Sequence, residues 1–211
     1  YQDKDKASDT YGAVTVSGGD NYQGTAISNI LKGTPVNEML KEIGIVASAI
    51  GNHEYDWGAD KIKPWADEAG FKFLAANLIE EATGLTPNYA EPYLITNVDG
   101  VKIGFIGITT PETETKTRKE NVDGLKFLDP VEAVNKYSEK LRSEGAELIV
   151  ALTHSGSIEN EDGTITGEAA DIAKNANDID AVISAHTHLF VDGFVKNNNG
   201  KDVPVVQAGN N

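Results

Sequence analysis

Short apolar runs alternate with amphipathic segments along most of the chain, which is the pattern of an α/β domain. In residues 34–43 the apolar side chains recur at positions 36, 39, 40 and 43, as on one face of a helix, and Gly44 ends the segment. Residues 45–50 form an apolar run that is broken only at Ser48 and bounded by Gly51, which indicates a buried strand. The pattern therefore predicts a helix followed by a strand here.

Two pairs of segments predict β-hairpins. Residues 93–98 and 101–108 flank the turn Asp99-Gly100, and residues 190–195 and 203–207 flank a turn at 197–200. Within the predicted helix at 59–69, Pro64 must begin a new turn or kink the helix. The remaining predicted strands are at 13–17, 147–152 and 181–184, and the remaining predicted helices are at 129–145 and 168–176.

Four polar residues each fall just after a predicted strand: Asp20, Asn52, His154 and His186. In α/β sheets the carboxyl ends of the strands are where ligand-binding loops gather. Four separate strand ends can therefore place four ligands around one point.

The chain has four histidines and no cysteine. His53 lies in Gly-Asn-His-Glu, His154 in Thr-His-Ser-Gly, and His186 and His188 in Ala-His-Thr-His, so the histidines are concentrated in short polar runs. Without thiolates, a transition metal must take imidazole, carboxylate and carbonyl ligands. This favours a hydrolytic metal such as manganese, iron(II) or zinc over a structural zinc held by thiolates.

Composition narrows the choice of partner. The 211 residues are 39% hydrophobic, which is ordinary for a globular domain, and no apolar run approaches the roughly 20 residues that cross a bilayer. The formal charge is −15, from 18 basic and 33 acidic side chains, which argues against a nucleic-acid polymer as partner. A small phosphate ester remains compatible with this charge if divalent ions supply the positive field. The absence of cysteine constrains the compartment only weakly.

Four runs carry a resemblance to a known family. They are residues 17–25, 51–56, 152–156 and 185–188, which contain Ser-Gly-Gly-Asp-Asn-Tyr-Gln-Gly-Thr, Gly-Asn-His-Glu-Tyr-Asp, Leu-Thr-His-Ser-Gly and Ala-His-Thr-His. In these runs and their order the chain resembles the calcineurin-like metallophosphoesterases, and within them the 5′-nucleotidase and 2′,3′-cyclic-nucleotide phosphodiesterase family. The resemblance covers essentially the whole chain. It implies an α/β sandwich of two mixed β-sheets flanked by helices.

The resemblance also implies a site for two divalent ions, with manganese, zinc or iron as candidates. Asp20 would bridge both ions, Asn52, His154 and His186 would complete the second site, and His188 would belong to the first. The implied reaction is hydrolysis of a nucleotide phosphoester by attack of a metal-bound hydroxide, as in nucleotide catabolism.

Two further roles follow from the same resemblance. His53 would not bind metal but would hydrogen-bond the phosphate or protonate the leaving group. Asp56, three residues later, would orient the His53 imidazole and favour its charged form. Glu54 between them is expected to be structural and to accept hydrogen bonds from loop backbone donors.

The chain departs from the family at both ends. The family's first strand carries an Asp-x-His run that supplies two ligands of the first metal, and Asp9-Thr10-Tyr11 is no substitute for it. The first site then retains only Asp20 and His188, so residues 1–211 are expected to bind one metal and to hydrolyse weakly. Residues 205–211 resemble the strand that leads to a C-terminal substrate domain. We therefore expect one catalytic domain, truncated at both ends, whose substrate domain lies elsewhere in the full protein.

Other interpretations of the same residues stay open. A Gly-Gly-Asp turn can be an Asx-turn, Asn52 can hold a left-handed turn, His154 can be a core histidine, and Asp56 can cap a helix. The chain could be a metal-binding or structural piece without catalysis, or could act on another ester, such as a sugar nucleotide or a sulfur-linked substrate.

Relatives of this kind are often exported and attached to the bacterial surface, so an extracellular or cell-surface location is expected.

Overall fold

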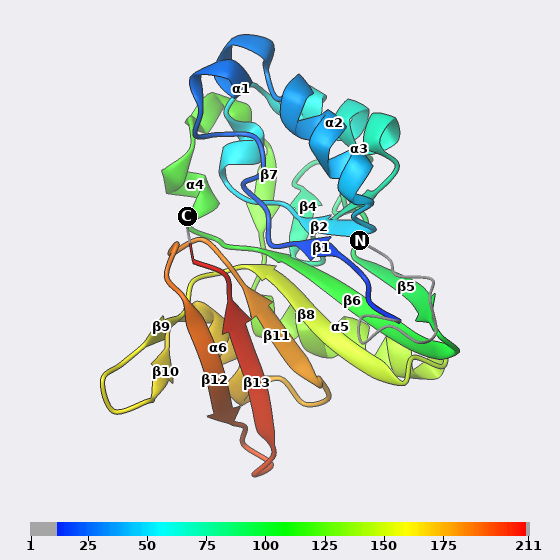
Figure 1. The fold of residues 1–211 in the computed structure, drawn as a ribbon, viewed down its shortest axis with the longest axis vertical. Helices are drawn as coiled ribbons and strands as arrows, with labels where there is room; N and C mark the ends of the chain where they lie inside the picture. The colour runs from blue at the N-terminus through cyan, green and yellow to red at the C-terminus, as the bar shows by residue number, and fades with distance from the viewer. Residues whose placement is uncertain (1–11, 210–211) are drawn as a thin grey trace.

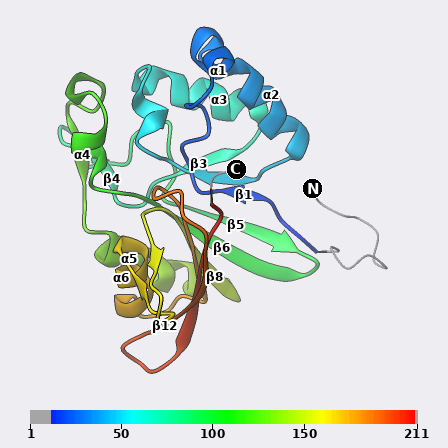
Figure 2. The ribbon, with the colours of Figure 1, turned by 60° about the vertical axis from the view of Figure 1, so that its left-hand side comes forward.

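Two β-sheets pack face to face, and helices cover the outer face of each (Figure 1). The computed structural model describes residues 12–209. After a turn of the molecule by 60°, helices α1 to α3 still lie on one side of the sheets and α5 and α6 on the other (Figure 2). The α/β sandwich expected from the sequence is confirmed.

The larger sheet has six strands in the order β12-β13-β11-β8-β6-β5. Its inner strands β13, β11, β8 and β6 are parallel, and antiparallel hairpins close both edges. The strands are β5 (Tyr93–Val98), β6 (Val101–Thr109), β8 (Leu148–His154), β11 (Ala181–Ser184), β12 (Val191–Lys196) and β13 (Asp202–Gln207). Because the inner strands are parallel, the carboxyl ends of β6, β8 and β11 meet at one edge of the sheet.

The smaller sheet contains β1 (Val16–Ser17), β2 (Ala47–Ala49) and β3 (Lys72–Leu74), which are parallel to one another. Two short ribbons lie outside both sheets. They pair β4 (Leu78–Glu80) with β7 (Leu125–Phe127), and β9 (Ile158–Glu159) with β10 (Ile165–Thr166).

The helices belong to two groups and to short connecting turns. Helices α1 (Ala26–Leu31), α2 (Thr34–Ile43) and α3 (Ile62–Ala69) lie by the smaller sheet, and α5 (Pro130–Ser143) and α6 (Glu168–Asn175) lie by the larger. Short turns are α4 (Thr113–Lys116), η1 (His53–Tyr55), η2 (Ala59–Lys61) and η3 (Lys119–Asn121). Helix α5 begins where the Asp129 side chain accepts the Glu132 N–H, and α2 ends at Gly44 with φ of 74°.

Three apolar clusters hold these layers together. One cluster lies between α5, α6 and the larger sheet, and a second lies between α2, α3 and the smaller sheet. The third lies between the two sheets and contains Ala47, Ala49, Leu74, Phe105 and Leu152. The alanines of β2 keep this interface thin, so strands of both sheets can direct their ends toward the same place.

Most elements predicted from hydrophobic patterning are present. Both hairpins form, and the first turns at Asp99-Gly100 with Val98 paired to Val101. The segment 59–69 divides into η2 and α3, so Pro64 lies in the first turn of α3, where its missing N–H needs no partner. The prediction gave no helix at α1 or α4 and no strand at β3, β4, β7, β9 or β10. Within residues 12–209, no helix combines the length and hydropathy that a bilayer span requires.

One buried carboxylate joins the loops that follow β1 and β2. Glu54 is fully buried, and its oxygens accept the backbone N–H groups of Asp20 at 2.8 Å, Asn21 at 2.7 Å and Gly51 at 2.6 Å. Burial and the negative charge of Asp20 raise the pKa of Glu54 to about 7, while the charge of His154 and the backbone donors act in the opposite direction. Glu54 therefore has the structural role expected from the sequence.

The contact between the sheets at Gly107 gives the first prediction. A Cβ atom at Gly107 would lie 2.2 Å from Leu74 Cβ and 2.4 Å from the Leu74 carbonyl oxygen, so β3 would have to move. We expect Gly107→Ala to lower the free energy of unfolding by about 3 kcal/mol, measured by urea denaturation.

Gly104 in the same strand is the matched control. A Cβ there meets side-chain atoms of Leu141, with Cδ1 at 2.8 Å and Cδ2 at 3.0 Å, whereas a Cβ at Gly107 meets the backbone of Leu74. A side chain can shift more easily than a strand backbone, so Gly104→Ala should cost less than Gly107→Ala. Equal losses for the two variants would contradict a close contact between the sheets at Gly107.

A second prediction concerns the three N–H groups on Glu54. Glu54→Gln replaces one accepting oxygen with an NH₂ group, which then faces a backbone N–H. We expect a loss of about 3 kcal/mol in the free energy of unfolding, because a buried donor loses its acceptor. Urea denaturation at pH 8, where Glu54 is ionised, measures this loss. Glu42→Gln, at an exposed position of α2, should leave the stability unchanged, and a Glu54→Gln variant as stable as this control would refute the structural role.

Candidate metal centre at the strand ends

Three of the residues selected by the sequence come together between the two sheets. Asp20 follows β1, His154 ends β8, and His186 follows β11. One ligand atom from each lies within 4.8 Å of the other two. His154 Nε2 is 3.0 Å from Asp20 Oδ2 and 3.2 Å from His186 Nδ1. Residues from three strand ends thus form one compact group.

The hydrogen bond of His154 to the backbone fixes which ring nitrogen faces this group. Its Nδ1 lies 2.8 Å from the carbonyl oxygen of Gly18, and because a carbonyl only accepts, Nδ1 carries the proton. Nε2 is then the ring nitrogen that faces Asp20 and His186, and it is the atom through which His154 could bind a cation. A backbone carbonyl that accepts from one ring nitrogen commonly orients the other nitrogen of a metal-binding histidine in this way.

The charges in the group influence one another. Burial acts to raise the pKa of Asp20, but the hydrogen bond and charge of His154 outweigh it and hold that pKa below its usual value. Burial acts to lower the pKa of His154, but Asp20 outweighs it and the pKa is raised. Burial and the charge of His154 lower the pKa of His186. One carboxylate and two imidazoles therefore share a confined space, which a divalent cation would suit.

Asn52 also supports a cation site at the group of Asp20, His154 and His186. Its side chain is buried, and its Oδ1 has no hydrogen-bond partner among the described residues. A buried acceptor without a partner is costly and needs an explanation. The next residue, His53, donates its backbone N–H to Asp20 Oδ1 at 2.8 Å, so Asn52 is adjacent to the group. A carboxylate, two imidazoles and an amide oxygen are a ligand set that fits manganese, iron or zinc.

Glycines explain why the loops can approach so closely. A Cβ at Gly18 would lie 2.7 Å from Ala185 Cβ, and one at Gly19 would lie 2.9 Å from the Ala49 carbonyl oxygen. At Gly51 a Cβ would lie 2.1 Å from Asp20 Oδ1. The Gly-Gly-Asp and Gly-Asn-His-Glu runs therefore have glycine wherever a side chain would separate the strand ends.

The backbone is unusual at three of the candidate ligands. Asp20, His186 and His188 have φ angles of 59°, 74° and 60°, in the left-handed region that side chains rarely adopt. Such strain clusters at functional sites, where the surrounding structure enforces it.

His53 and Asp56 form a pair beside the group. His53 Nδ1 lies 2.8 Å from Asp56 Oδ2, and the imidazole is 40% exposed. Asp56 also accepts Gln23 Nε2 at 2.6 Å and Thr117 Oγ1 at 3.4 Å, so its carboxylate is held from three directions. The predicted orienting contact of Asp56 on His53 is present, while their catalytic roles stay predictions.

His188 is placed differently from the other candidates. It is exposed and is not part of the group formed by Asp20, His154 and His186. Its assignment to a first metal site stays a prediction.

Sequence reasoning missed Glu112, whose Oε2 lies 3.2 Å from His186 Nε2. Glu112 follows β6, so it too lies just beyond the carboxyl end of a strand. The criterion that selected Asp20, Asn52, His154 and His186 would also have found Glu112 if it had been applied to the strand predicted at 101–108.

A cavity of about 280 Å³ adjoins the group at His186 and is also lined by Glu112, Glu168, Thr110 and Thr187. Burial raises the pKa of Glu168 in this cavity.

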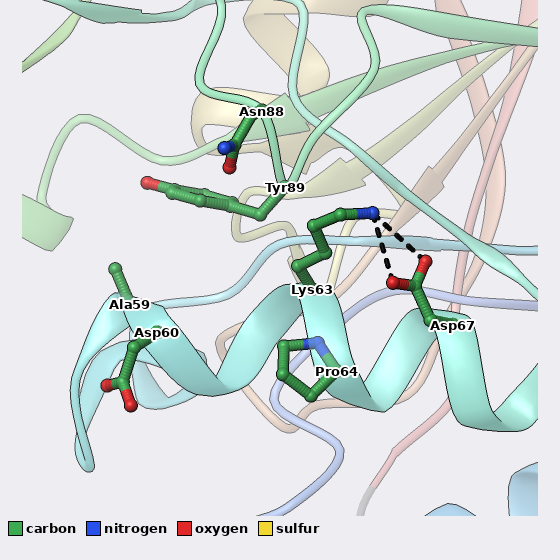
Figure 3. Close-up of a pocket in the computed structure, with 7 residues that line it drawn as sticks. All are labelled: Ala59, Asp60, Lys63, Pro64, Asp67, Asn88 and Tyr89. Carbon is green, nitrogen blue, oxygen red and sulfur yellow. Dashed lines mark hydrogen bonds and ion pairs between the residues drawn. The ribbon is translucent and has the colours of Figure 1, made fainter.

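A second cavity, of about 400 Å³, lies between α3 and the segment with Asn88 and Tyr89. Figure 3 shows Tyr89 over α3, with Lys63 and Asp67 paired beside it, to the right in this view. None of the candidate ligands lines this second cavity. Of these two cavities, the one beside His186 adjoins the group, so a substrate could reach the group there.

Curated relatives match nearly the whole chain. It is 33% identical to "Endonuclease YhcR" of Bacillus subtilis over 97% of this chain and 17% of that protein. It is 30% identical to "Cell wall protein Lmo0130" of Listeria monocytogenes over 96% of this chain and 29% of that protein. It is 34% identical to "Snake venom 5'-nucleotidase" of Gloydius brevicauda over 90% of this chain and 34% of that protein. The chain thus spans about a third or less of the length of these relatives.

The fold is shared with solved structures. The 5′-nucleotidase precursor from Thermus thermophilus superposes with a TM-score of 0.78 and 28% identity, covering 92% of this chain and 39% of that one. A family model described as calcineurin-like phosphoesterase matches residues 7–190, which include all the candidate ligands. The chain belongs to the calcineurin-like phosphoesterase family.

Proposed function

We propose that the protein containing this chain hydrolyses phosphate esters of nucleotides, with a divalent cation held by Asp20, Asn52, His154 and His186. One observation carries this proposal: in a calcineurin-like phosphoesterase, a carboxylate and two imidazoles from three strand ends converge beside a buried amide oxygen that has no partner within residues 12–209. Divalent ions bound there would lower the pKa of a water, clamp the phosphoryl group and stabilise the leaving oxygen.

The proposed ligands differ in what they supply. Asp20 has two carboxylate oxygens and can bridge two ions, whereas His154 offers only Nε2. Asp20, Asn52, His154 and His186 are proposed as the four ligands of one ion, and His188, together with Asp20, is proposed for a second ion. Manganese, zinc and iron all suit this mixture of nitrogen and oxygen.

His53 is proposed to act on the substrate and not on the cation. Its ring is held through Nδ1 by Asp56, so Nε2 is free to donate a hydrogen bond to the phosphate or a proton to the leaving oxygen. A charged ring can donate from both nitrogens, to Asp56 from Nδ1 and to the substrate from Nε2.

Nucleotides are the proposed substrate class because relatives of this chain are named 5′-nucleotidases. One relative is named an endonuclease, which raises the alternative of a nucleic-acid polymer. The formal charge of −15 disfavours that alternative, because a polyanion gains little from an acidic surface. Other esters, such as a sugar nucleotide, would use the same groups and are separated by a substrate panel.

The full protein is proposed to act outside the cell or at its surface, since one relative is named a cell wall protein and another a venom enzyme. We further propose that another part of the full protein completes the substrate pocket, because the chain spans about a third or less of these relatives.

Metal binding and hydrolysis provide the third prediction. In the full protein, Asp20→Asn should weaken Mn²⁺ binding more than about 100-fold in calorimetry and abolish hydrolysis of adenosine 5′-monophosphate and 2′,3′-cyclic adenosine monophosphate. Chelation should abolish hydrolysis, and added Mn²⁺ should restore it. Asp123→Asn, at an exposed loop position, is the control and should behave as the unchanged protein.

Residues 1–211 alone should bind one ion and hydrolyse these substrates only weakly. Two tightly bound ions in this shorter chain would contradict the assignment of ligands. A full protein that binds no divalent ion, or that hydrolyses none of the esters when loaded, would refute the proposed function.

The fourth prediction separates His53 from the metal ligands. His53→Gln should lower kcat by about 10²–10⁴-fold, because a proton donor is lost, while Mn²⁺ affinity stays unchanged. Asp56→Asn should lower kcat by about 10–100-fold through the orientation of His53. Asp60→Asn on η2, an exposed residue, should change neither quantity. Loss of Mn²⁺ affinity in His53→Gln would instead place His53 among the ligands.

A further inference from the structure

The two ring nitrogens of His186 face different groups. Nδ1 lies 3.2 Å from His154 Nε2, on the side of the ring that faces Asp20. Nε2 lies 3.2 Å from Glu112 Oε2. Among the described residues these are the ring's hydrogen-bonding neighbours, so Glu112 is the carboxylate that contacts His186 from outside the cluster.

The loop that carries Glu112 is attached to the end of β8. The Thr110 N–H donates to the carbonyl oxygen of His154 at 3.0 Å, and the Glu112 N–H donates to Thr110 Oγ1 at 3.2 Å. The Thr113 N–H donates to the Thr110 carbonyl oxygen at 3.1 Å, and the Thr113 side chain is fully buried. The backbone of a proposed ligand, His154, therefore fixes the loop that brings Glu112 to a second proposed ligand, His186.

We propose that Glu112 is a positioning residue that accepts the Nε2–H of His186 and thereby keeps Nδ1 unprotonated and directed at the cation. The inference rests on the cation site of the proposed function. An ionised carboxylate can only accept hydrogen bonds, so its bond to Nε2 requires the proton on that nitrogen. The lone pair of the neutral ring is then on Nδ1, the nitrogen that faces Asp20 and His154.

A plain surface ion pair is the competing interpretation, because the Glu112 side chain is 59% exposed. Such a pair adds little to folding stability. It would not, however, explain why the anchored loop brings the carboxylate to the one nitrogen that points away from the cluster. The backbone of His186 is also held at φ of 74°, a conformation that persists only where the surrounding structure enforces it. The two interpretations predict different tautomers once Glu112 is removed.

The test compares three variants of the full protein. Glu112→Ala removes the acceptor, whereas Glu112→Gln keeps an accepting carbonyl oxygen and removes the charge. Glu114→Ala is the matched control, since Glu114 is an exposed residue of α4 two positions away. Mn²⁺ affinity is measured by calorimetry, and the His186 tautomer by ¹⁵N–¹H correlation spectroscopy of the metal-free protein.

Positioning by Glu112 predicts a graded result. Glu112→Ala should weaken Mn²⁺ binding by about 10–100-fold, Glu112→Gln by only a few-fold, and Glu114→Ala should match the unchanged protein. The metal-free protein should carry the His186 proton on Nε2, and Glu112→Ala should populate the other tautomer.

Two outcomes would overturn the inference. One is unchanged Mn²⁺ affinity and tautomer in Glu112→Ala, which would leave only a surface ion pair. The other is an equal loss of affinity in Glu112→Ala and Glu112→Gln with the tautomer unchanged, which would show that only the charge matters. If the unchanged protein binds no Mn²⁺, the proposed function fails, and the tautomer of the metal-free protein still decides the role of Glu112.

Discussion

The carboxylate of Glu54 is the interaction on which the arrangement of the candidate site depends. It is fully buried and accepts three backbone N–H groups, two from the turn after β1 and one from the turn after β2. A single side chain thus sets the separation of the loops that carry Asp20 and Asn52. A buried charge is tolerated only where donors surround it, and here the donors belong to the two loops that the site requires. The same contact therefore stabilises the fold and shapes the site.

The thin interface between the sheets brings the rest of the site into place. Small residues of β2 and the close contact of Gly107 with Leu74 let the sheets approach, so strand ends of the larger sheet reach the Gly-Gly-Asp turn of the smaller one. His154 then donates from Nδ1 to Gly18 across this boundary. Helices on the outer faces contribute apolar packing and none of the candidate ligands. The chemistry of the site thus depends on the joining of two sheets, which agrees with membership of the calcineurin-like phosphoesterases.

Local signals in the sequence predicted much of this structure. The spacing of apolar residues predicted α2, and the turn Asp99-Gly100 predicted the first hairpin. Polar residues that directly follow a strand included Asp20, His154 and His186, which lie together in the structure. Short elements such as β3 and α1 were missed because their residues are fixed by tertiary contacts more than by pattern. Glu112 also follows a strand and could have been selected by the same criterion, whereas its pairing with His186, 74 positions away, depends on the tertiary structure.

The left-handed backbone at Asp20, His186 and His188 limits which amino acids could replace them. Asp and Asn tolerate positive φ better than most residues, and β-branched or bulky residues tolerate it poorly. A redesign that exchanged these positions for other ligand types, to accept a softer or a larger ion, would meet a conformational penalty before any question of coordination arose. The loops would have to be rebuilt together with the side chains. The backbone torsion angles at these three positions thus limit which ions a redesigned site could bind, whatever the affinity of the new ligands.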